Sequence, residues 1–322
     1  MTDKTPYANT IFEQPWWLEA VSPSAWHESI VTENDEVIGR LPFVLQKKRF
    51  GVKAIHMPRY TQTIGPWIKH REFEVGNSHL SKQKAIIKML LNNLPKVKYL
   101  NINTSLENTY VLPYSWNGYH ITPLFTYRIP DLTDLEDLAS KFHKTVHKNI
   151  RSASKKVEIK DDVDLDIIFT INEKLFKNQG RNDPTDKQVI ERIVAASLAH
   201  NAGKMLYAVD SQGNIHGYLF LVYDENVCYY LLAGSNPEFR SSGAQSLLLW
   251  EAIKFSATVS KAFDFEGSNV EGIENFVRQF GSPQFVYYNI SKQPFLYDFL
   301  EILKPRVKKV LRSVLPSFFS NK

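Results

Sequence analysis

Hydrophobic residues follow two periodicities along this 322-residue chain, one typical of strands and one typical of helices. The clearest strand signal is the continuous apolar and aromatic run at residues 227–234, which predicts a buried strand. Further on, apolar side chains recur with the spacing of one helix face, at Leu247, Leu248, Ala252 and Phe255. The sequence therefore predicts a strand, a tight turn at residues 240–243 and a helix.

The turn at 240–243 carries the residues of an anion site. Gly243 allows backbone conformations that point N–H groups at a ligand, and Arg240 adds a cation. The start of the following helix offers free N–H donors with the helix dipole behind them. Three or four charge-assisted bonds of roughly 1.5–3 kcal/mol each would hold a pyrophosphate. A plain strand-to-helix turn fits the same spacing.

The two halves of the chain repeat this pattern at one offset. Residues 100–105 (L-N-I-N-T-S) align with 263–268 (F-D-F-E-G-S), and the predicted helix around Ile87 aligns with that around Trp250. The same offset pairs two glycines that precede aromatic strands, Gly118 and Gly281. Because helix, strand and turn agree, we predict a duplication. Each copy is expected to hold antiparallel strands, a helix, a strand, a helix and a final strand.

Only the second copy keeps residues that can carry chemistry. The alignment places Asn77 and Leu80 opposite Arg240 and Gly243, and Asn101 and Asn103 opposite Asp264 and Glu266. The first copy thus lacks the cation, the flexible turn and the carboxylates. We expect it to bind an acceptor, with substrate in the cleft between the copies.

Two carboxylates lie on a predicted strand of the second copy. Strand alternation sends Phe263 and Phe265 to one face and Asp264 and Glu266 to the other. If both acids face the anion turn, burial and mutual repulsion raise the pKa of one of them, which suits a general base. Two solvated acids on a strand face would give the same pattern.

Composition narrows the class of protein. The chain is 43% hydrophobic and 23% charged, which is typical of a folded globular protein, and its length suits two domains. The single cysteine, Cys228, excludes an intrachain disulfide and suits a reducing compartment. The first residues contain no apolar signal-peptide core, and no apolar run approaches 18 residues. A cytoplasmic location is expected.

Two basic clusters contribute to the net charge of +5, which favours acidic partners. In residues 141–160, cations recur on one helix face, at Lys144, Lys148, Arg151 and Lys155. This face is either solvated or turned toward phosphates. Residues 304–322 are basic and apolar with no acid. They either cover the second domain or rest on an anionic membrane at its inner face.

The anion turn also carries a family resemblance. Residues 237–253, P-E-F-R-S-S-G-A-Q-S-L-L-L-W-E-A-I, resemble the acyl-CoA pyrophosphate loop of GNAT acetyltransferases, Q/R-x-x-G-x-G/A. Gln245 stands where that pattern has Gly or Ala. The longer string is similar to the FemAB-like branch of the superfamily, as are 263–268 and G-I-E-N-F-V-R-Q-F-G at 272–281. H-K-N-I-R-S-A at 147–153 and N-Q-G at 178–180 are also family-like.

The resemblance implies an α+β fold of two tandem GNAT-like domains with mixed, mostly antiparallel sheets. The domains are expected at 1–138, an acceptor-binding copy, and at 139–303, the acyltransferase, followed by the tail at 304–322. It implies transfer of an acyl group from acetyl-CoA or another acyl-CoA to an amine. The nine histidines show no ligand-like spacing, so we expect no metal. The donor would be bound by Arg240, Ser241, Ser242, Gly243, Ala244 and Gln245. Glu266 is the first choice of base and Asp264 the second.

The resemblance also indicates the acceptor and the alternatives. The acceptor is expected to be an amino sugar or a cell-envelope or polysaccharide precursor, free or on a nucleotide or lipid carrier. Candidate acceptor contacts are Arg59, Tyr60, Gln62, Gln179, Arg181 and Ser268. One alternative is Fem-type transfer from aminoacyl-tRNA to a peptidoglycan precursor. Another is a non-catalytic protein that binds envelope precursors.

Overall fold

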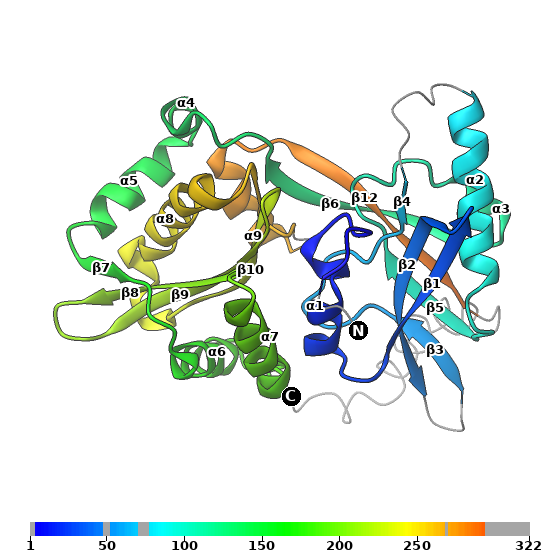
Figure 1. Cartoon of the computed structure of the whole chain (residues 1–322). Coiled ribbons are helices and arrows are strands. Elements are labelled where there is room, and N and C mark those ends of the chain that lie inside the picture. The colour runs from blue at the N-terminus through cyan, green and yellow to red at the C-terminus, as the bar shows by residue number, and fades with distance from the viewer. Residues whose placement is uncertain (1–3, 48–51, 70–76, 268–269, 294–322) are drawn as a thin grey trace, which may run out of the picture.

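The computed structural model describes residues 4–47, 52–69, 77–267 and 270–293 (Figure 1). Ser268 and the tail at 304–322 lie outside the described residues. The helices of the first half are η1 (Ile11–Glu13), α1 (Pro15–Val21), α2 (Asn77–Asn92) and α3 (Leu112–Trp116). Those of the second are α4 (Leu135–Ser140), α5 (Lys144–Ala153), α6 (Leu165–Asn178), α7 (Lys187–Ala199), η3 (Pro237–Ser242), α8 (Ala244–Val259), α9 (Glu271–Val277) and η4 (Arg278–Phe280).

The described strands form one twelve-stranded mixed sheet. They are β1 (Trp26–Glu33), β2 (Glu36–Lys47), β3 (Lys53–His56), β4 (Trp67–Ile68), β5 (Tyr99–Asn103), β6 (His120–Ile129), β7 (Val157–Lys160), β8 (Gly203–Asp210), β9 (Ile215–Tyr223), β10 (Val227–Ser235), β11 (Ala262–Asp264) and β12 (Gln284–Lys292). Their order is β1-β2-β3-β5-β12-β6-β11-β10-β9-β8-β7, with β4 beside β2. Among these pairs, only β3–β5 and β10–β11 are parallel, so the expected mostly antiparallel α+β fold is confirmed.

The two halves exchange their last strands. β6, which ends the first half, pairs with β11 of the second half, and β12 pairs with β5 of the first. β6 and β12 pair with each other and run together across the centre of the molecule (Figure 1). Neither half is therefore a closed unit, although each carries its own repeat of the sequence.

The strand registers reproduce the duplication. Leu124 and Tyr287 are equivalent positions of the two copies, and they pair with each other at the middle of β6–β12. The pair Asn101–Ser291 in the first half corresponds to Asp264–Arg128 in the second. A local two-fold relation thus passes through the central strand pair. Upstream of α2 this offset no longer holds, because the first half has a longer segment between its strands and its helix.

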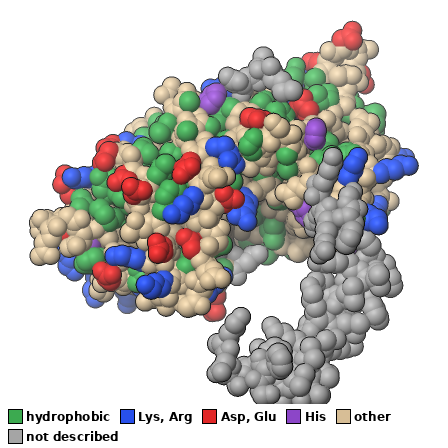
Figure 2. Space-filling view, turned by 90° about the horizontal axis from the view of Figure 1, so that it is seen from below, with side chains coloured by type: hydrophobic (Ala, Val, Ile, Leu, Met, Phe, Trp, Pro, Cys, Tyr) green, Lys and Arg blue, Asp and Glu red, His purple; other side chains and the backbone are tan. Residues whose placement is uncertain are grey.

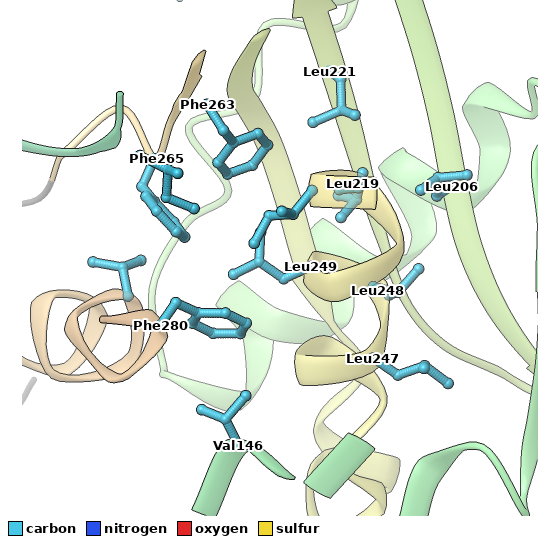
Figure 3. Packing of buried hydrophobic residues seen from close by; sticks show 14 of the residues in the cluster. Val146, Leu206, Leu219, Leu221, Leu247, Leu248, Leu249, Phe263, Phe265 and Phe280 are labelled. Carbon is cyan, nitrogen blue, oxygen red and sulfur yellow. The ribbon is translucent and has the colours of Figure 1, made fainter. Parts of the chain in front are cut away.

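Helix α8 lies at the centre of the second half. Its residues Leu247, Leu248 and Leu249 are buried, since the sheet covers one side of the helix and α5 another. In Figure 3, Leu219 and Leu221 of β9 face α8 from the sheet, and Phe263 and Phe280 approach from the side. Burial of such side chains contributes about 1.5–3 kcal/mol each. This core fixes where α8 begins, and so where the anion turn lies.

The first helix of the chain packs on the second half. Trp16 and Trp17 of α1 share a core with Ile193 of α7, and Arg192 Nε donates to the Ala20 carbonyl at 2.8 Å. The boundary near residue 138 therefore stays a prediction, and strand exchange and α1 join the two halves across it.

The surface seen in Figure 2 carries basic and acidic side chains interspersed with hydrophobic and other atoms. None of the helices in the described part of the chain is both long and apolar enough to cross a membrane.

Candidate active site

An opening forms where two parallel strands of the second half separate. β10 and β11 pair only from Val227–Ala262 to Tyr229–Asp264, after which β10 continues to Ser235 while β11 ends. No described strand pairs with that edge of β10 beyond Tyr229. The β9–β10 register shifts between Tyr230 and Leu232, a bulge that bends β10. The strands therefore diverge and leave a gap.

A cavity of about 660 Å³ occupies this gap. One wall is β10 from Tyr230 to Ser235, and the opposite wall is Phe265, Glu266 and Gly267. The remaining lining comes from α5, the end of α6, the start of α8 and α9. Its size suits a small organic ligand. All of its lining residues belong to the second half, so this cavity is not the cleft between the copies that we expected to hold substrate.

The predicted anion turn forms one end of the cavity. Gly243 caps α8 with φ +83°, and a Cβ there would lie 2.8 Å from the Asn149 carbonyl oxygen of α5. Only glycine fits this left-handed conformation and close approach without strain. Arg240, Gly243 and Gln245 line the cavity, whereas Ser241, Ser242 and Ala244 do not. Ser242 Oγ accepts from the Ala244 N–H at 3.2 Å and so orders the turn.

Gln245 departs from the GNAT pattern, and its surroundings accommodate it. Its Nε2 donates to the Tyr230 hydroxyl at 2.8 Å. Burial raises the pKa of Tyr230 to about 12, so this phenol stays neutral. A Cβ at Gly217 would lie 2.9 Å from Gln245 Oε1, which means that the space for this side chain comes from a glycine on β9.

Glu266 lies on the wall opposite β10. It adopts φ +57°, and its Oε1 is shielded from solvent with no hydrogen-bond donor among the described residues. Burial, reinforced by the negative charge of Asp264, raises the pKa of Glu266 well above its usual range. A carboxylate in this state binds a proton more tightly than an ordinary glutamate does, which suits a general base.

Asp264 is completely buried and does not line the cavity. Its Oδ1 accepts from Thr126 Oγ1 at 2.6 Å and from the Glu266 N–H at 2.7 Å, and its Oδ2 pairs with Arg128 Nε at 2.8 Å. Gln62 Nε2 also donates to Oδ1, at 3.3 Å. The expectation that strand alternation sends both acids to one space is wrong, because β11 ends at Asp264 and Glu266 follows in a left-handed turn.

Arg128 and Thr126 were not predicted as site residues. Both lie on β6, which belongs to the first copy and reaches Asp264 only through strand exchange. The available signal was one charged residue inside the aromatic segment F-T-Y-R-I.

In the first half, the chain itself occupies the space that corresponds to the cavity. β3 and β5 are parallel and pair at Ile55–Leu100, as β10 and β11 do. Beyond this point the Ile64 N–H donates to the Asn103 carbonyl at 3.0 Å, and the Asn103 N–H approaches Met57 Sδ at 3.1 Å. Residues 57–64 therefore cover the end of β5, whose counterpart in the second half, Phe265 and Glu266, faces the cavity.

The candidate acceptor residues do not share one place. Arg59 pairs with Asp186 at the start of α7 at 3.4 Å, and the Tyr60 hydroxyl accepts from the Asp186 N–H at 3.1 Å. Gln62 contacts Asp264, as described above, while its Oε1 is buried without a partner among the described residues. Gln179 lines the cavity, and Arg181 is exposed beside Phe176.

Comparison with known proteins shows what this fold is similar to. Residues 140–271 match the family model of the acetyltransferase (GNAT) domain. The fold is similar to that of FemX over 88% of this chain and 92% of that one, with a TM-score of 0.64 and 12% identity. The chain has a FemAB-like GNAT fold. No curated protein matches its sequence.

Other structures support two GNAT-like units. A tandem GNAT protein from the clavulanic acid biosynthesis pathway is similar over 85% of each chain, with a TM-score of 0.51 and 11% identity. The C-terminal domain of a putative lysylphosphatidylglycerol synthetase from Agrobacterium fabrum is similar over 89% of each chain, with a TM-score of 0.53 and 8% identity. The GNAT domain at 140–271 ends before β12, and β6 completes its sheet instead.

Proposed function

We propose that this GNAT-like protein is an N-acyltransferase that moves an acyl group from an acyl-CoA, such as acetyl-CoA, to an amine. The observation that carries the proposal is the cavity between β10 and β11, which is lined by the anion turn and by Glu266, whose Oε1 has no hydrogen-bond partner among the described residues. The pyrophosphate would lie at Arg240, Gly243 and the start of α8. The extended arm of the donor would lie along the open edge of β10, whose backbone can bond it.

The reaction needs little beyond positioning and removal of a proton. The amine nitrogen attacks the thioester carbonyl carbon, a C–N bond forms, and the C–S bond breaks. The nitrogen loses a second proton as the amide forms, and the departing thiolate takes up one proton to leave as the thiol. The bound ammonium first loses a proton, which Glu266 accepts. Holding the reactants together supplies most of the rate, and a base adds roughly 10²–10⁴-fold. Asp264, which is buried behind the cavity, would act on Glu266 instead of on the substrate.

The acceptor is proposed to be an amino sugar or another cell-envelope or polysaccharide precursor, free or carrier-linked. Gln179 is the candidate acceptor contact that lines the cavity. Gln62, Arg59 and Tyr60 bridge the first half to Asp264 and to the start of α7. We therefore expect them to shape the approach to the cavity from the acceptor side. An acceptor contact by Ser268 and a membrane contact by residues 304–322 stay predictions, because both lie outside the described residues.

One observation favours a second candidate, transfer from aminoacyl-tRNA. The exposed face of α5 and the turn after it form an open basin of about 670 Å³ lined by five cations with His147 and Ser152, and without an acid. None of these cations has an acidic partner within ion-pair distance in the described part of the chain. Asn149, on the same helix, lines the donor cavity. An extended phosphate backbone would suit this basin.

Arg240→Ala tests the donor site. We expect acetyl-CoA to bind this variant about 1.5–3 kcal/mol more weakly, roughly 10- to 160-fold in Kd, because one charge-assisted contact to phosphate is lost. Isothermal titration measures the change. Asn77→Ala alters the equivalent position of the first copy and should leave the Kd unchanged. Equal Kd values for all three proteins would remove the loop from the donor site. Binding of tRNA in place of acetyl-CoA would favour the second candidate.

A further inference from the structure

The position of Glu266 depends on a strand from the other half of the molecule. The Glu266 N–H donates to Asp264 Oδ1 at 2.7 Å, which holds its backbone in the left-handed turn. Asp264 is in turn fixed by Thr126 and Arg128, both on β6. Gly267 packs so closely on β6 that a Cβ there would lie 2.1 Å from the Phe125 carbonyl oxygen. The turn that carries Glu266 is thus pinned to the exchanged strand.

We propose that Arg128, contributed by the first half, is a positioning residue that acts through Asp264 to hold Glu266 at the cavity wall. The inference rests on the proposed N-acyltransferase function. The Arg128 side chain is 11% exposed and that of Asp264 is fully buried, so the ion pair is little screened by water. Arg128 does not line the cavity and makes no contact with the space for the substrate. Arg128 acts on Glu266 through the carboxylate of Asp264, which pairs with Arg128 and accepts from the Glu266 N–H.

The equivalent positions in the first half carry no charge. Asn101 corresponds to Asp264 and Asn103 to Glu266, and Asn289 Nδ2 donates to their side-chain oxygens at 3.0 and 2.8 Å. Ser291 stands where Arg128 stands in the second half. Equivalent strand pairs, β5–β12 and β11–β6, meet in the two halves, so the fold alone does not require the ion pair. Of these equivalent positions, only those of the second half, next to the cavity, carry charged side chains.

The arrangement predicts that substitutions of Asp264 and of Arg128, its ion-pair partner, shift the pH profile of kcat/KM in opposite directions. A general base must be deprotonated, so kcat/KM falls as the pH drops below the pKa of Glu266. Asp264→Asn removes a like charge, which lowers that pKa and moves the acid limb of the profile to lower pH. Arg128→Met leaves Asp264 without its counter-charge, which raises the pKa of Glu266 and moves the limb to higher pH. Each shift should be about one pH unit or more.

The experiment compares pH profiles of kcat/KM for the parent, Asp264→Asn, Arg128→Met and Arg128→Lys. Arg128→Lys keeps the charge and should keep the limb within a few tenths of a pH unit of the parent. Asn101→Ala, at the matching place in the first half, should not move it. Acetyl-CoA affinity and thermal melting are measured for every variant, because donor binding tests the proposed function separately from the ion pair.

Limb shifts of opposite sign for Asp264→Asn and Arg128→Met establish the proposal. Shifts of the same sign, or profiles that coincide with the parent, overturn it. If Arg128→Met does not fold, the comparison of Asp264→Asn with Arg128→Lys decides. The acid limb must lie at lower pH than in the parent for Asp264→Asn, and at the pH of the parent for Arg128→Lys. Failure of the parent itself to bind acetyl-CoA would instead contradict the proposed function.

Discussion

Glu266→Gln is expected to lower turnover at pH 7 by about 10²–10⁴-fold while leaving acetyl-CoA affinity unchanged. The amide has the size of the carboxyl group but cannot accept the proton of the bound ammonium. Burial and the charge of Asp264 raise the pKa of Glu266, so the parent should lose activity at a higher pH than an ordinary glutamate would. Steady-state kinetics from pH 5 to 10, as a chosen assay range, measure both effects.

High pH provides an internal control for Glu266→Gln. An amine that deprotonates unaided no longer needs the base, so the variant should approach the parent as the pH rises. Glu271→Gln alters an exposed acid that does not line the cavity, and it should behave as the parent does. A constant ratio of the two rates at every pH would assign Glu266 a structural role.

Gly267→Ala is expected to lower the free energy of unfolding by about 2–5 kcal/mol. The left-handed conformation, φ +52°, costs an alanine about 1–2 kcal/mol. Its Cβ would also lie 2.1 Å from the Phe125 carbonyl oxygen and 2.8 Å from Thr126 Cα, and overpacking adds about 1–3 kcal/mol. Because both contacts are with backbone, no rotamer change relieves them. Denaturant titration measures the loss.

A second glycine of the same cavity serves as control for Gly267→Ala. A Cβ at Gly272 would meet no atom within 4 Å, and the φ of this residue is not positive. Gly272→Ala should therefore change stability by no more than about 1 kcal/mol. Turnover of Gly267→Ala should also fall, since the turn that carries Glu266 must move away from β6. A variant as stable and as active as the parent would show that the turn is not pinned to the exchanged strand.

The sequence predicted the parts of the site that depend on local chemistry. Strand, turn and helix at 227–255 are confirmed, because apolar periodicity and Gly243 determine them within one segment. The duplication fits the registers of the central strands, since a fixed offset relates both the strands and their partners. The location of Arg240 and Glu266 on one cavity followed from the order of these elements.

Strand exchange could not be predicted from the repeat. β6 and β12 are equivalent, so either could pair with β11 without changing the pattern of hydrophobic positions. Only side-chain packing in three dimensions selects β6, and with it Arg128 and Thr126. The end of β11 at Asp264 was missed for a related reason, because F-D-F-E alternates as a longer strand would. Its continuation as a left-handed turn depends on Gly267 and its contact with Phe125.

The central claim is that the gap between β10 and β11 binds an acyl donor. Amide hydrogen exchange with and without acetyl-CoA tests it most directly, because backbone N–H groups of β10 and of the first turn of α8 are the expected contacts. The account predicts slower exchange at residues 230–235 and 243–247, and no change at residues 57–64 or 99–103 of the first half. Protection confined to other segments, or none at saturating acetyl-CoA, would contradict it.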